Sequence, residues 1–279
     1  MGALDGKVAV VTGGSSGIGR ATALALAAEG ADTAIVGRNE NALDEVAAQI
    51  RATGRRILPG VVDVRDEAQV GAFLDRTVAE LGRVDIVVNN AGISYPGGIV
   101  EGKVDAWRDI LDTNLLALLI CCREAVRVMR PSGHGHIVNI SSGTTKFLRP
   151  MGSVYTGAKH AMYYISDALR EEVRDMGIQV SCIVPGLTLT NIGRNAPLEV
   201  LEARFRAVGA DPTDAQPGEY FAEHLEPILE QQPGVYLASE DVARAVIYAV
   251  TQPYHVEVEN VVIRPRLGLT IEGEKRHDR

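Results

Sequence analysis

The feature that most constrains the fold is a regular alternation between short apolar runs and segments with helical spacing. Most runs are continuous, such as Ile86-Val87-Val88, which is typical of strands covered by helices on both faces. They predict seven strands, at residues 7–12, 33–37, 57–62, 85–89, 136–141, 179–185 and 258–263. Helices are predicted at residues 18–29, 39–52, 66–81, 104–130, 154–176 and 239–252. This alternation implies an α/β fold with a doubly wound parallel sheet, which binds ligands at the carboxyl ends of its strands.

Composition and charge narrow the class of protein. The 279 residues, 46% of them hydrophobic, suit a single domain with a sizeable core. A net charge of -8 argues against binding to nucleic acid or to an anionic membrane surface. The chain starts without a secretion-signal pattern, and its longest apolar run, residues 115–122, is too short to span a bilayer. We therefore expect a cytoplasmic protein.

Cysteine and histidine spacing predicts no metal site. Cys121, Cys122 and Cys182 cannot form a disulfide framework and lack the spacing of metal ligands. The six histidines are scattered in the same way. The cysteines are expected to be buried in a reducing environment.

Residues 187–238 interrupt the alternation without a clear strand. A long irregular insert inside a compact domain is usually a binding lid, although a surface loop without function is the alternative. Its apolar residues favour a largely apolar ligand over a compact polar one. We expect these lid residues to be Ile192, Leu198, Val200, Leu201, Phe205, Tyr220, Phe221, Leu225 and Leu229, above a floor from residues 94–96 and 147–148.

A glycine-rich turn joins the first predicted strand to the first predicted helix. Glycine permits a tight turn and lets backbone N–H groups approach a pyrophosphate, which the helix N-terminus also attracts. Arg20-Ala21 follows Gly19, so the turn is not the phosphate loop of a nucleotide hydrolase. It predicts dinucleotide binding on a Rossmann-type fold, through Gly13, Ser15, Ser16, Gly17, Ile18 and Gly19.

The end of the second predicted strand distinguishes the two nicotinamide cofactors. NAD is recognised there by an acidic residue that binds the ribose hydroxyls. This chain instead has Arg38, whose guanidinium can pair with a 2′-phosphate. Asp32 lies at the other end of the strand, about 15 Å away at 3.3 Å per residue. We therefore expect NADP(H) in preference to NAD(H).

Tyr155 and Lys159 supply a candidate acid–base pair. Positions i and i+4 share one helix face, so the phenol and the ammonium can converge on one site. A free tyrosine has a pKa of about 10, and a nearby cation stabilises its phenolate. A shift to near neutrality requires roughly 4 kcal/mol, which a lysine and a cationic nicotinamide ring could supply at close range.

Other polar residues are predicted at the same sheet edge. Ser141 and Ser142 follow the fifth predicted strand, where a hydroxyl can orient a carbonyl oxygen. Asn90, Ala91 and Gly92 follow the fourth predicted strand and allow close backbone approach to the cofactor. Asn114 lies in an apolar segment and needs hydrogen-bond partners; it is either part of a water relay to Lys159 or a structural amide.

These motifs resemble the short-chain dehydrogenase/reductase family in order and spacing over residues 7–265. The resemblance implies a sheet ordered 3-2-1-4-5-6-7 and a catalytic tetrad of Asn114, Ser142, Tyr155 and Lys159. Ser142 is preferred to Ser141 because the family's serine lies thirteen residues before its tyrosine. The remaining cofactor contacts implied are Asp63 and Val64 at the adenine, Asn90 at the ribose, and Thr190 at the nicotinamide carboxamide or phosphates. Further cofactor contacts are expected from Ala91, Gly92, Pro185, Gly186 and Thr188.

The resemblance also implies a concerted mechanism. Hydride passes between nicotinamide C4 and the substrate carbon while Tyr155 gives or takes the hydroxyl proton. With the apolar residues of segment 187–238 above the site, a largely apolar secondary alcohol or ketone is expected in preference to a compact sugar or hydroxy acid. Ser142 holds the substrate oxygen, Lys159 lowers the pKa of the phenol and binds ribose, and Asn114 continues the proton path. The predicted helices 104–130 and 154–176 are the family's usual subunit interface, so a homo-oligomer, a dimer or a tetramer, is expected.

Three alternatives to this function remain open. A 3-oxoacyl carrier-protein reductase would need a basic docking face, for which Arg123, Arg127 and Arg130 are candidates. A non-catalytic NADP(H)-binding sensor or scaffold would bind the cofactor without turnover. A sugar-nucleotide epimerase or dehydratase shares the Tyr-x-x-x-Lys spacing but requires a larger C-terminal substrate domain.

Overall fold

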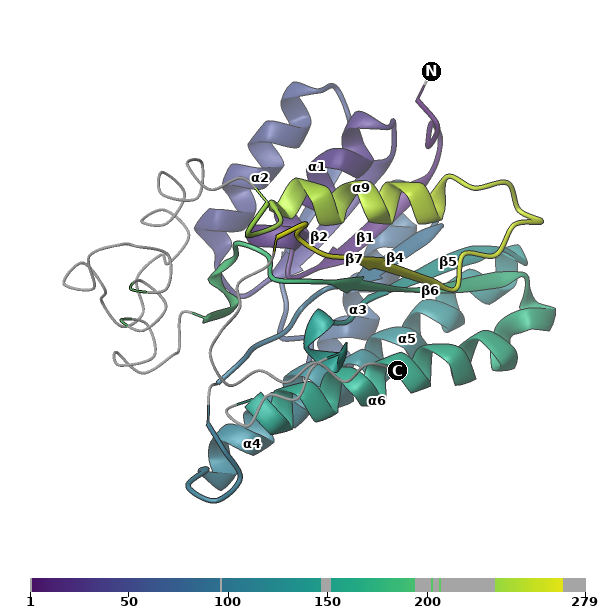
Figure 1. Cartoon of the computed structure of the whole chain (residues 1–279). Helices are drawn as coiled ribbons and strands as arrows, with labels where there is room; N and C mark the ends of the chain where they lie inside the picture. The colour runs from purple at the N-terminus through teal and green to yellow at the C-terminus, as the bar shows by residue number, and fades with distance from the viewer. Residues whose placement is uncertain are drawn as a thin grey trace.

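The protein is built on one seven-stranded parallel sheet (Figure 1). The computed structural model describes residues 2–95, 97–146, 152–193, 202, 206 and 234–267. The strand order is β3-β2-β1-β4-β5-β6-β7, and every neighbouring pair is parallel. The predicted fold class and strand order are therefore confirmed. The strands are β1 (Val8–Thr12), β2 (Asp32–Gly37), β3 (Ile57–Val61), β4 (Ile86–Asn89), β5 (Gly135–Ile140), β6 (Ile178–Pro185) and β7 (Asn260–Ile263).

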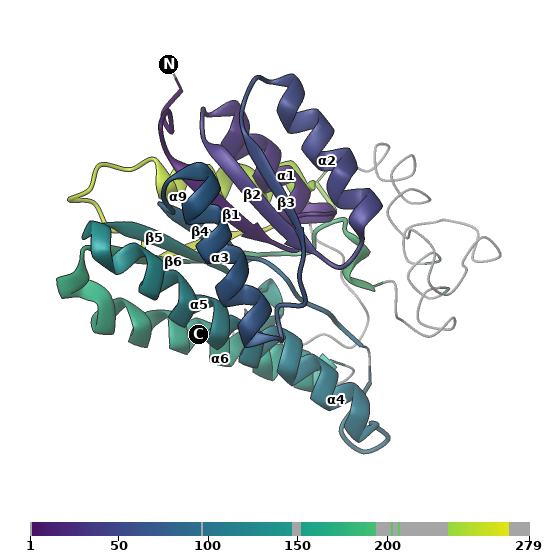
Figure 2. The same ribbon diagram turned by 180° about the vertical axis from the view of Figure 1, so that it is seen from behind.

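Helices cover both faces of the sheet, which explains why the strands are apolar on both sides (Figures 1 and 2). One face packs against α1 (Gly17–Ala28), α2 (Glu40–Ala52) and α9 (Ser239–Val250). The other packs against α3 (Glu67–Leu81), α5 (Ala117–Met129) and α6 (Ser153–Val173). The helices run antiparallel to the strands. Each helix that follows a strand therefore begins at the carboxyl edge of the sheet.

The predicted helix 104–130 is interrupted. It consists of α4 (Val104–Leu111), one π-helical turn η1 (Asp112–Leu116) and α5, after which Arg130 begins a short 3-10 turn. The physical reason lies in Asn114, which is fully buried in the π turn. Its side-chain amide donates to the carbonyls of Ile93 and Ile110, both at 2.9 Å. A π turn contains one more residue than an α-helical turn, and here it directs the Asn114 side chain into the interior.

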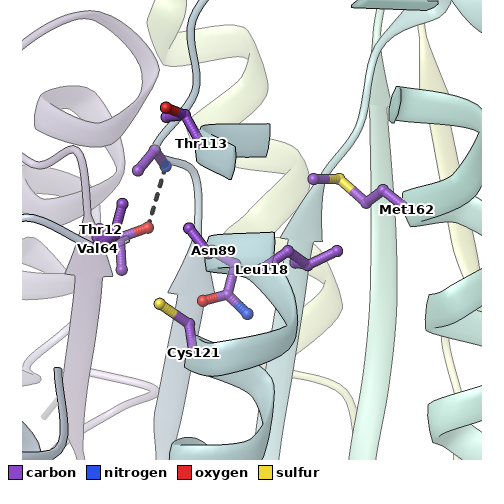
Figure 3. A pocket seen from close by; sticks show the side chains of 9 residues that line it. Thr12, Val64, Asn89, Thr113, Leu118, Cys121 and Met162 are labelled. Atoms are coloured by element: carbon purple, nitrogen blue, oxygen red, sulfur yellow. Dashed lines mark hydrogen bonds between the residues drawn. The ribbon is translucent and has the colours of Figure 1, made fainter. Parts of the chain in front are cut away.

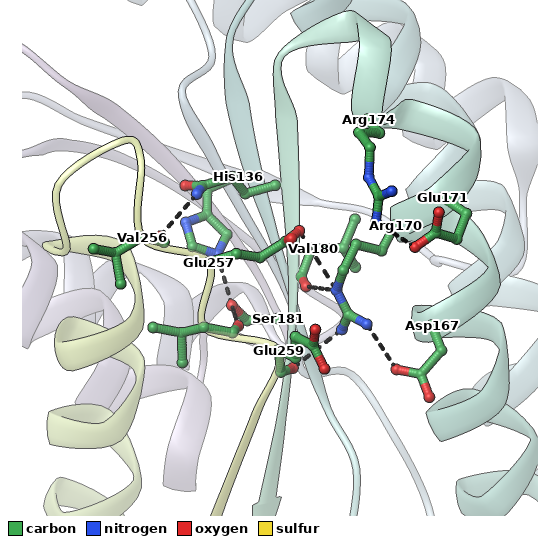
Figure 4. A network of polar contacts seen from close by, with 12 residues as sticks. His136, Asp167, Arg170, Glu171, Arg174, Val180, Ser181, Val256, Glu257 and Glu259 are labelled. Carbon is green, nitrogen blue, oxygen red and sulfur yellow. Dashed lines mark hydrogen bonds and ion pairs between the residues drawn. The ribbon is translucent and has the colours of Figure 1, made fainter.

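Polar contacts around the buried residues Arg170 and His136 lie at the amino edge of the sheet (Figure 4). Arg170, which is 5% exposed, donates to the carbonyls of Val180 and Glu259 and pairs with Asp167 at 2.9 Å. His136 is hydrogen-bonded to Ser181 at 2.8 Å, and burial lowers the pKa of its imidazole to about 4. These contacts attach the segment before β7 to α6 and β6.

Of the predicted lid 187–238, the structure describes residues 187–193, 202, 206 and 234–238. Thr188 pairs with Leu237 in a parallel bridge, so the two ends of the insert lie side by side. Of the expected lid residues, only Ile192 is described, and it is 40% exposed. Among the described residues, no helix is long and apolar enough to cross a membrane. The expected lid and floor residues outside the described part are Pro96, Phe147, Leu148, Leu198, Val200, Leu201, Phe205, Tyr220, Phe221, Leu225 and Leu229.

Candidate active site

The glycine turn is held against the end of β4 by a threonine and an asparagine. The Thr12 hydroxyl accepts the backbone N–H groups of Asn90 and Ala91, both at 3.0 Å. The Asn90 amide donates in return to the carbonyls of Thr12 and Gly13, at 2.9 and 3.3 Å. Two segments 78 residues apart in sequence are thus joined at the carboxyl edge of the sheet.

The turn is too compact for side chains at its glycines. Gly13 has a φ of 66°, and a Cβ on Gly19 would lie 2.1 Å from the Gly13 carbonyl oxygen. Ser16 caps α1 without a side-chain hydrogen bond, so the first backbone N–H groups of the helix are available to an anion. Ser15 belongs to the same turn, and half-buried Ile18 is the second residue of α1. The cradle therefore fits a dinucleotide pyrophosphate.

The end of β2 carries a cation next to this turn. Arg38 is exposed and directly follows β2, whose last residue, Gly37, lies beside Ser15. A hydrogen bond from Arg65 lowers the pKa of the Asp63 carboxyl. Burial opposes this shift in part, and the charge of Arg38 adds to it. Asp32 begins β2 and pairs with Arg56 at 2.7 Å, so it lies at the opposite edge, as expected.

Tyr155 and Lys159 occupy the first turns of α6. The Lys159 ammonium lies 5.9 Å from the centre of the Tyr155 ring and donates to the Ile140 carbonyl at 2.8 Å. Lys159 is 3% exposed. Burial lowers the pKa of its ammonium to about 8, with a small opposing effect from Cys182. The side chain is therefore still mostly protonated at neutral pH.

The side chains of Asn114 and Lys159 both lie close to Gly92. A Cβ on Gly92 would lie 2.7 Å from the Asn114 side-chain oxygen and 3.7 Å from the Lys159 ammonium. The Asn114 oxygen also accepts the backbone N–H of Ile93 at 3.2 Å. The Asn114 amide is thus satisfied structurally and lies near the lysine, while a water relay between the two stays a prediction.

The two serines after β5 have different surroundings. Ser141 is 3% exposed, and its hydroxyl donates to the Lys159 backbone carbonyl at 3.0 Å. Ser142 is half-buried, and its hydroxyl accepts from the backbone N–H and the hydroxyl of Thr144. Because it accepts these two bonds, its own proton can be directed toward another oxygen. Ser142 is the less buried of the two serines, and its choice as the catalytic serine stays a prediction.

The segment after β6 returns to the glycine turn. Pro185 is buried, and a Cβ on Gly143 would lie 2.9 Å from the Gly186 Cα. The Thr188 hydroxyl donates to the Gly186 carbonyl at 3.0 Å. Thr190 lies beside Gly17, since a Cβ on that glycine would lie 3.3 Å from the threonine Cγ2. The predicted nicotinamide-side residues therefore lie at the same edge as the phosphate cradle.

A small cavity lies below this edge (Figure 3). Val64 and Ala91, two of the predicted cofactor contacts, line it together with Asn89. The Asn89 amide nitrogen donates to the Asn139 oxygen at 2.9 Å and contacts the Cys122 sulfur. Its oxygen has no hydrogen-bond partner among the described residues. The remaining lining residues are Thr12, Thr113, Ala117, Leu118, Cys121 and Met162.

Two expectations about other surfaces can be compared with the structure. Arg123 pairs with Glu67 at 2.7 Å and Arg127 with Asp75 at 2.9 Å, so their charges are largely neutralised. Arg130 is exposed. The supposed basic face is therefore weaker than the sequence suggests. The part of the chain that the structure describes contains no cluster of three or more His, Cys, Asp or Glu residues that could hold a metal ion.

Three residues that organise the site were not given these roles from the sequence, which offered Ser141 only as an alternative to Ser142. Thr12 joins the glycine turn to β4, Ser141 contacts the backbone of Lys159, and Arg65 holds Asp63 by contacts of 2.6 to 3.0 Å. For Thr12, its position directly before the glycines was an available signal. Ser141 and Arg65 act through side-chain contacts that the periodic pattern of apolar residues does not predict.

Comparisons with known proteins agree with this geometry. The family model described as short chain dehydrogenase matches residues 7–200. An uncharacterized oxidoreductase of Staphylococcus aureus (strain USA300) is 32% identical over 265 residues, which are 95% of this chain and 100% of that protein. A glycine betaine reductase of Emericella nidulans is 35% identical over 95% of this chain, which spans only 19% of that longer protein.

Solved structures show the same fold. A metagenomic short-chain oxidoreductase in complex with NADP has a TM-score of 0.73 at 27% identity, over 94% of this chain and 98% of that one. An alcohol dehydrogenase from the archaeon Thermococcus sibiricus, complexed with 5-hydroxy-NADP, has a TM-score of 0.74 at 25% identity, over 93% and 96%. The chain belongs to the short-chain dehydrogenase/reductase family. It is therefore an oxidoreductase of the class that acts on CH–OH groups.

Proposed function

We propose that this protein is an NADP(H)-dependent oxidoreductase that interconverts a secondary alcohol and a ketone, with Tyr155 as the general acid and base. The observation that carries the proposal is the buried Lys159 ammonium, 5.9 Å from the centre of the Tyr155 ring. A cation at that range in a poorly solvated site favours the phenolate form of the tyrosine. The proton of the substrate hydroxyl can then pass to or from Tyr155 at neutral pH.

The residues around the pair have complementary roles in this proposal. Ser142 donates its hydroxyl proton to the substrate oxygen and orients it. Lys159 stabilises the phenolate, and Asn114 leads the proton path away from the lysine. When bound, NADP(H) supplies or accepts the hydride. Its pyrophosphate would lie on the glycine turn, its adenosine near Asp63 and Val64, its ribose near Asn90 and Lys159, and its nicotinamide end near Thr188 and Thr190.

The choice of NADP(H) is supported by charge at the end of β2. Arg38 is exposed there, and none of the described carboxylates forms an ion pair with it. A 2′-phosphate would give the guanidinium a bidentate partner. The two neighbours crystallised with NADP or its 5-hydroxy derivative are consistent with this preference.

We infer further that residues 1–279 form one cytoplasmic nucleotide-binding domain that assembles into a dimer or a tetramer. Support for assembly comes from Leu111, Leu116 and Leu119, which are 42–48% exposed along α4, η1 and α5. Clustered exposed leucines on a helical face are typical of a subunit contact. The molar mass measured by light scattering after size-exclusion chromatography tests this inference: a mass of 29.8 kDa, that of one chain, would contradict it.

Substitution of Tyr155 tests the central proposal. We expect Tyr155→Phe to bind NADPH as wild type but to lose about a thousandfold in kcat, because the acid–base group is gone. The control is Tyr164→Phe, a tyrosine on the same helix that is 75% exposed and should be silent. Wild-type rates in Tyr155→Phe would contradict the mechanism.

The same assay separates the alternatives. Oxidation of NADPH is followed with a panel of apolar ketones, aldehydes, compact sugars and a 3-oxoacyl carrier protein. The similarity to a protein named glycine betaine reductase is a reason to include small polar carbonyl compounds. Turnover of the carrier-protein substrate alone would favour the carrier-protein reductase. Cofactor binding without turnover of any compound would favour a sensor.

A further inference from the structure

Ser141 lies between two residues that belong to the site. It follows β5, and its backbone N–H donates to the Ile183 carbonyl at 2.8 Å, so it still forms part of the sheet. The preceding residue, Ile140, accepts the Lys159 ammonium at 2.8 Å. The next residue, Ser142, presents the half-buried hydroxyl. Any shift of Ser141 therefore moves two parts of the site together.

The Ser141 side chain contacts the backbone of the same lysine. Its hydroxyl donates to the Lys159 carbonyl at 3.0 Å, with Ser141 itself 3% exposed. A carbonyl in the middle of a helix already accepts the N–H of the residue four positions later. The helix thus does not need this added bond for its own hydrogen-bonding pattern. Two consecutive residues therefore hold Lys159. Ile140, the last residue of β5, accepts from its ammonium, and Ser141, the next residue, donates to its backbone carbonyl.

We propose that Ser141 is a positioning residue of the reaction, which fixes the α6 backbone at Lys159 against the end of β5 and thereby sets the distance from the ammonium to the Tyr155 ring. This inference rests on the proposed function. The stabilisation of a phenolate by a cation depends on their separation and on the absence of competing positions. Lysine has a long flexible side chain, so its backbone must be fixed for its ammonium to be.

The groups that face the ammonium are few enough for a clear readout. Met162 contributes its sulfur at 3.9 Å, and among the described residues the titratable groups near the ammonium are Tyr155 on α6 and Cys182 on β6. Burial raises the pKa of the Cys182 thiol to about 11, so the thiol is neutral across the working range. Changes in the pH profile near neutrality therefore report on the Tyr155–Lys159 pair.

The experiment compares Ser141→Ala with Ser181→Ala in the full-length protein. Ser181 is the matched control, because it is a buried serine on β6 whose hydroxyl donates to the Val258 carbonyl at the other edge of the sheet. Both variants should lose thermal stability. Only Ser141→Ala should move the acid limb of the kcat profile for alcohol oxidation, by about one pH unit upward, which lowers kcat below the midpoint about tenfold. Ser141→Cys, with a weaker donor, should fall between wild type and Ser141→Ala.

The outcomes are distinct. If Ser141→Ala loses stability as Ser181→Ala does but keeps the wild-type pH profile and kcat, Ser141 is only structural and the inference is overturned. Wild type and Tyr155→Phe are measured in parallel, because absence of wild-type turnover would instead contradict the proposed function. In that event a crystal structure of Ser141→Ala decides the inference: a displaced Lys159 ammonium supports it, and an unmoved one overturns it.

Discussion

The two edges of the sheet bury cationic side chains in different ways. At the amino edge, Arg170 donates to two carbonyls and pairs with Asp167, so its guanidinium is well satisfied. At the carboxyl edge, Lys159 has one oxygen acceptor among the described residues, the Ile140 carbonyl. Both side chains are at most 5% exposed. Removal of a saturated buried cation destabilises the fold because its partners are left unpaired, whereas a buried cation with spare donors is costly and marks a functional site.

Replacement of Lys159 should separate stability from activity most strongly. We expect Lys159→Met to lower kcat about a thousandfold, because the phenolate loses its cation, a loss of about 4 kcal/mol. The free energy of unfolding should stay equal or rise, since an apolar side chain of similar length replaces a poorly satisfied ammonium. Kinetics and urea unfolding of the same preparation test both expectations. A variant that is strongly destabilised would show that Lys159 has the same structural role as Arg170.

At the amino edge, acid should act through His136. Burial lowers the pKa of this imidazole to about 4 from 6.5, so the unfolded chain binds the proton more readily. The contribution of neutral His136 is therefore complete above pH 6.5 and is lost as the pH falls toward 4, by about 3 kcal/mol in total. Urea unfolding of wild type and His136→Gln across this window isolates the effect. Parallel pH dependences in the two proteins would contradict the assignment.

Replacement of Arg170 should give the reverse of the Lys159 result. Arg170→Met leaves the carbonyls of Val180 and Glu259 without this donor, so we expect a loss of about 2 kcal/mol in unfolding free energy with little change in kcat. Arg174→Met is the control, because Arg174 is 60% exposed and pairs only with Glu171 among the described residues. A large fall in kcat for Arg170→Met would mean that the two edges are coupled.

The smallest expected effect concerns the exposed cation at the carboxyl edge. Arg38→Gln should weaken NADPH binding about tenfold and leave NADH binding unchanged, because only NADPH carries the 2′-phosphate. Arg51→Gln, which removes an exposed arginine from the last turn of α2, serves as the control. An equal loss of affinity for NADPH and NADH would show that Arg38 does not recognise the 2′-phosphate.

The carboxyl edge was more predictable from sequence than the contacts that complete it. The inner strands β1, β2, β4, β5 and β6 are mostly buried apolar runs, whereas the edge strands β3 and β7 are partly exposed. The apolar runs nevertheless located all seven strands to within about two residues. The glycine turn and Tyr155-x-x-x-Lys159 were readable because glycine and helical spacing act locally. The π turn at Asp112–Leu116 was not, since its cause is a contact between Asn114 and Ile93. The Ser141 bond spans 18 residues and the Arg170 contact with Glu259 spans 89, and no local pattern encodes such pairs.

A crystal structure of the protein with NADP⁺ tests the central claim most directly, because it measures where the nicotinamide ring lies relative to Tyr155 and Lys159. We expect the Tyr155 hydroxyl to face the reactive side of the ring, with the Lys159 ammonium within hydrogen-bond distance of the adjoining ribose. A ring bound beyond reach of the Tyr155 hydroxyl, with Lys159 turned away from the ribose, would contradict the proposed chemistry.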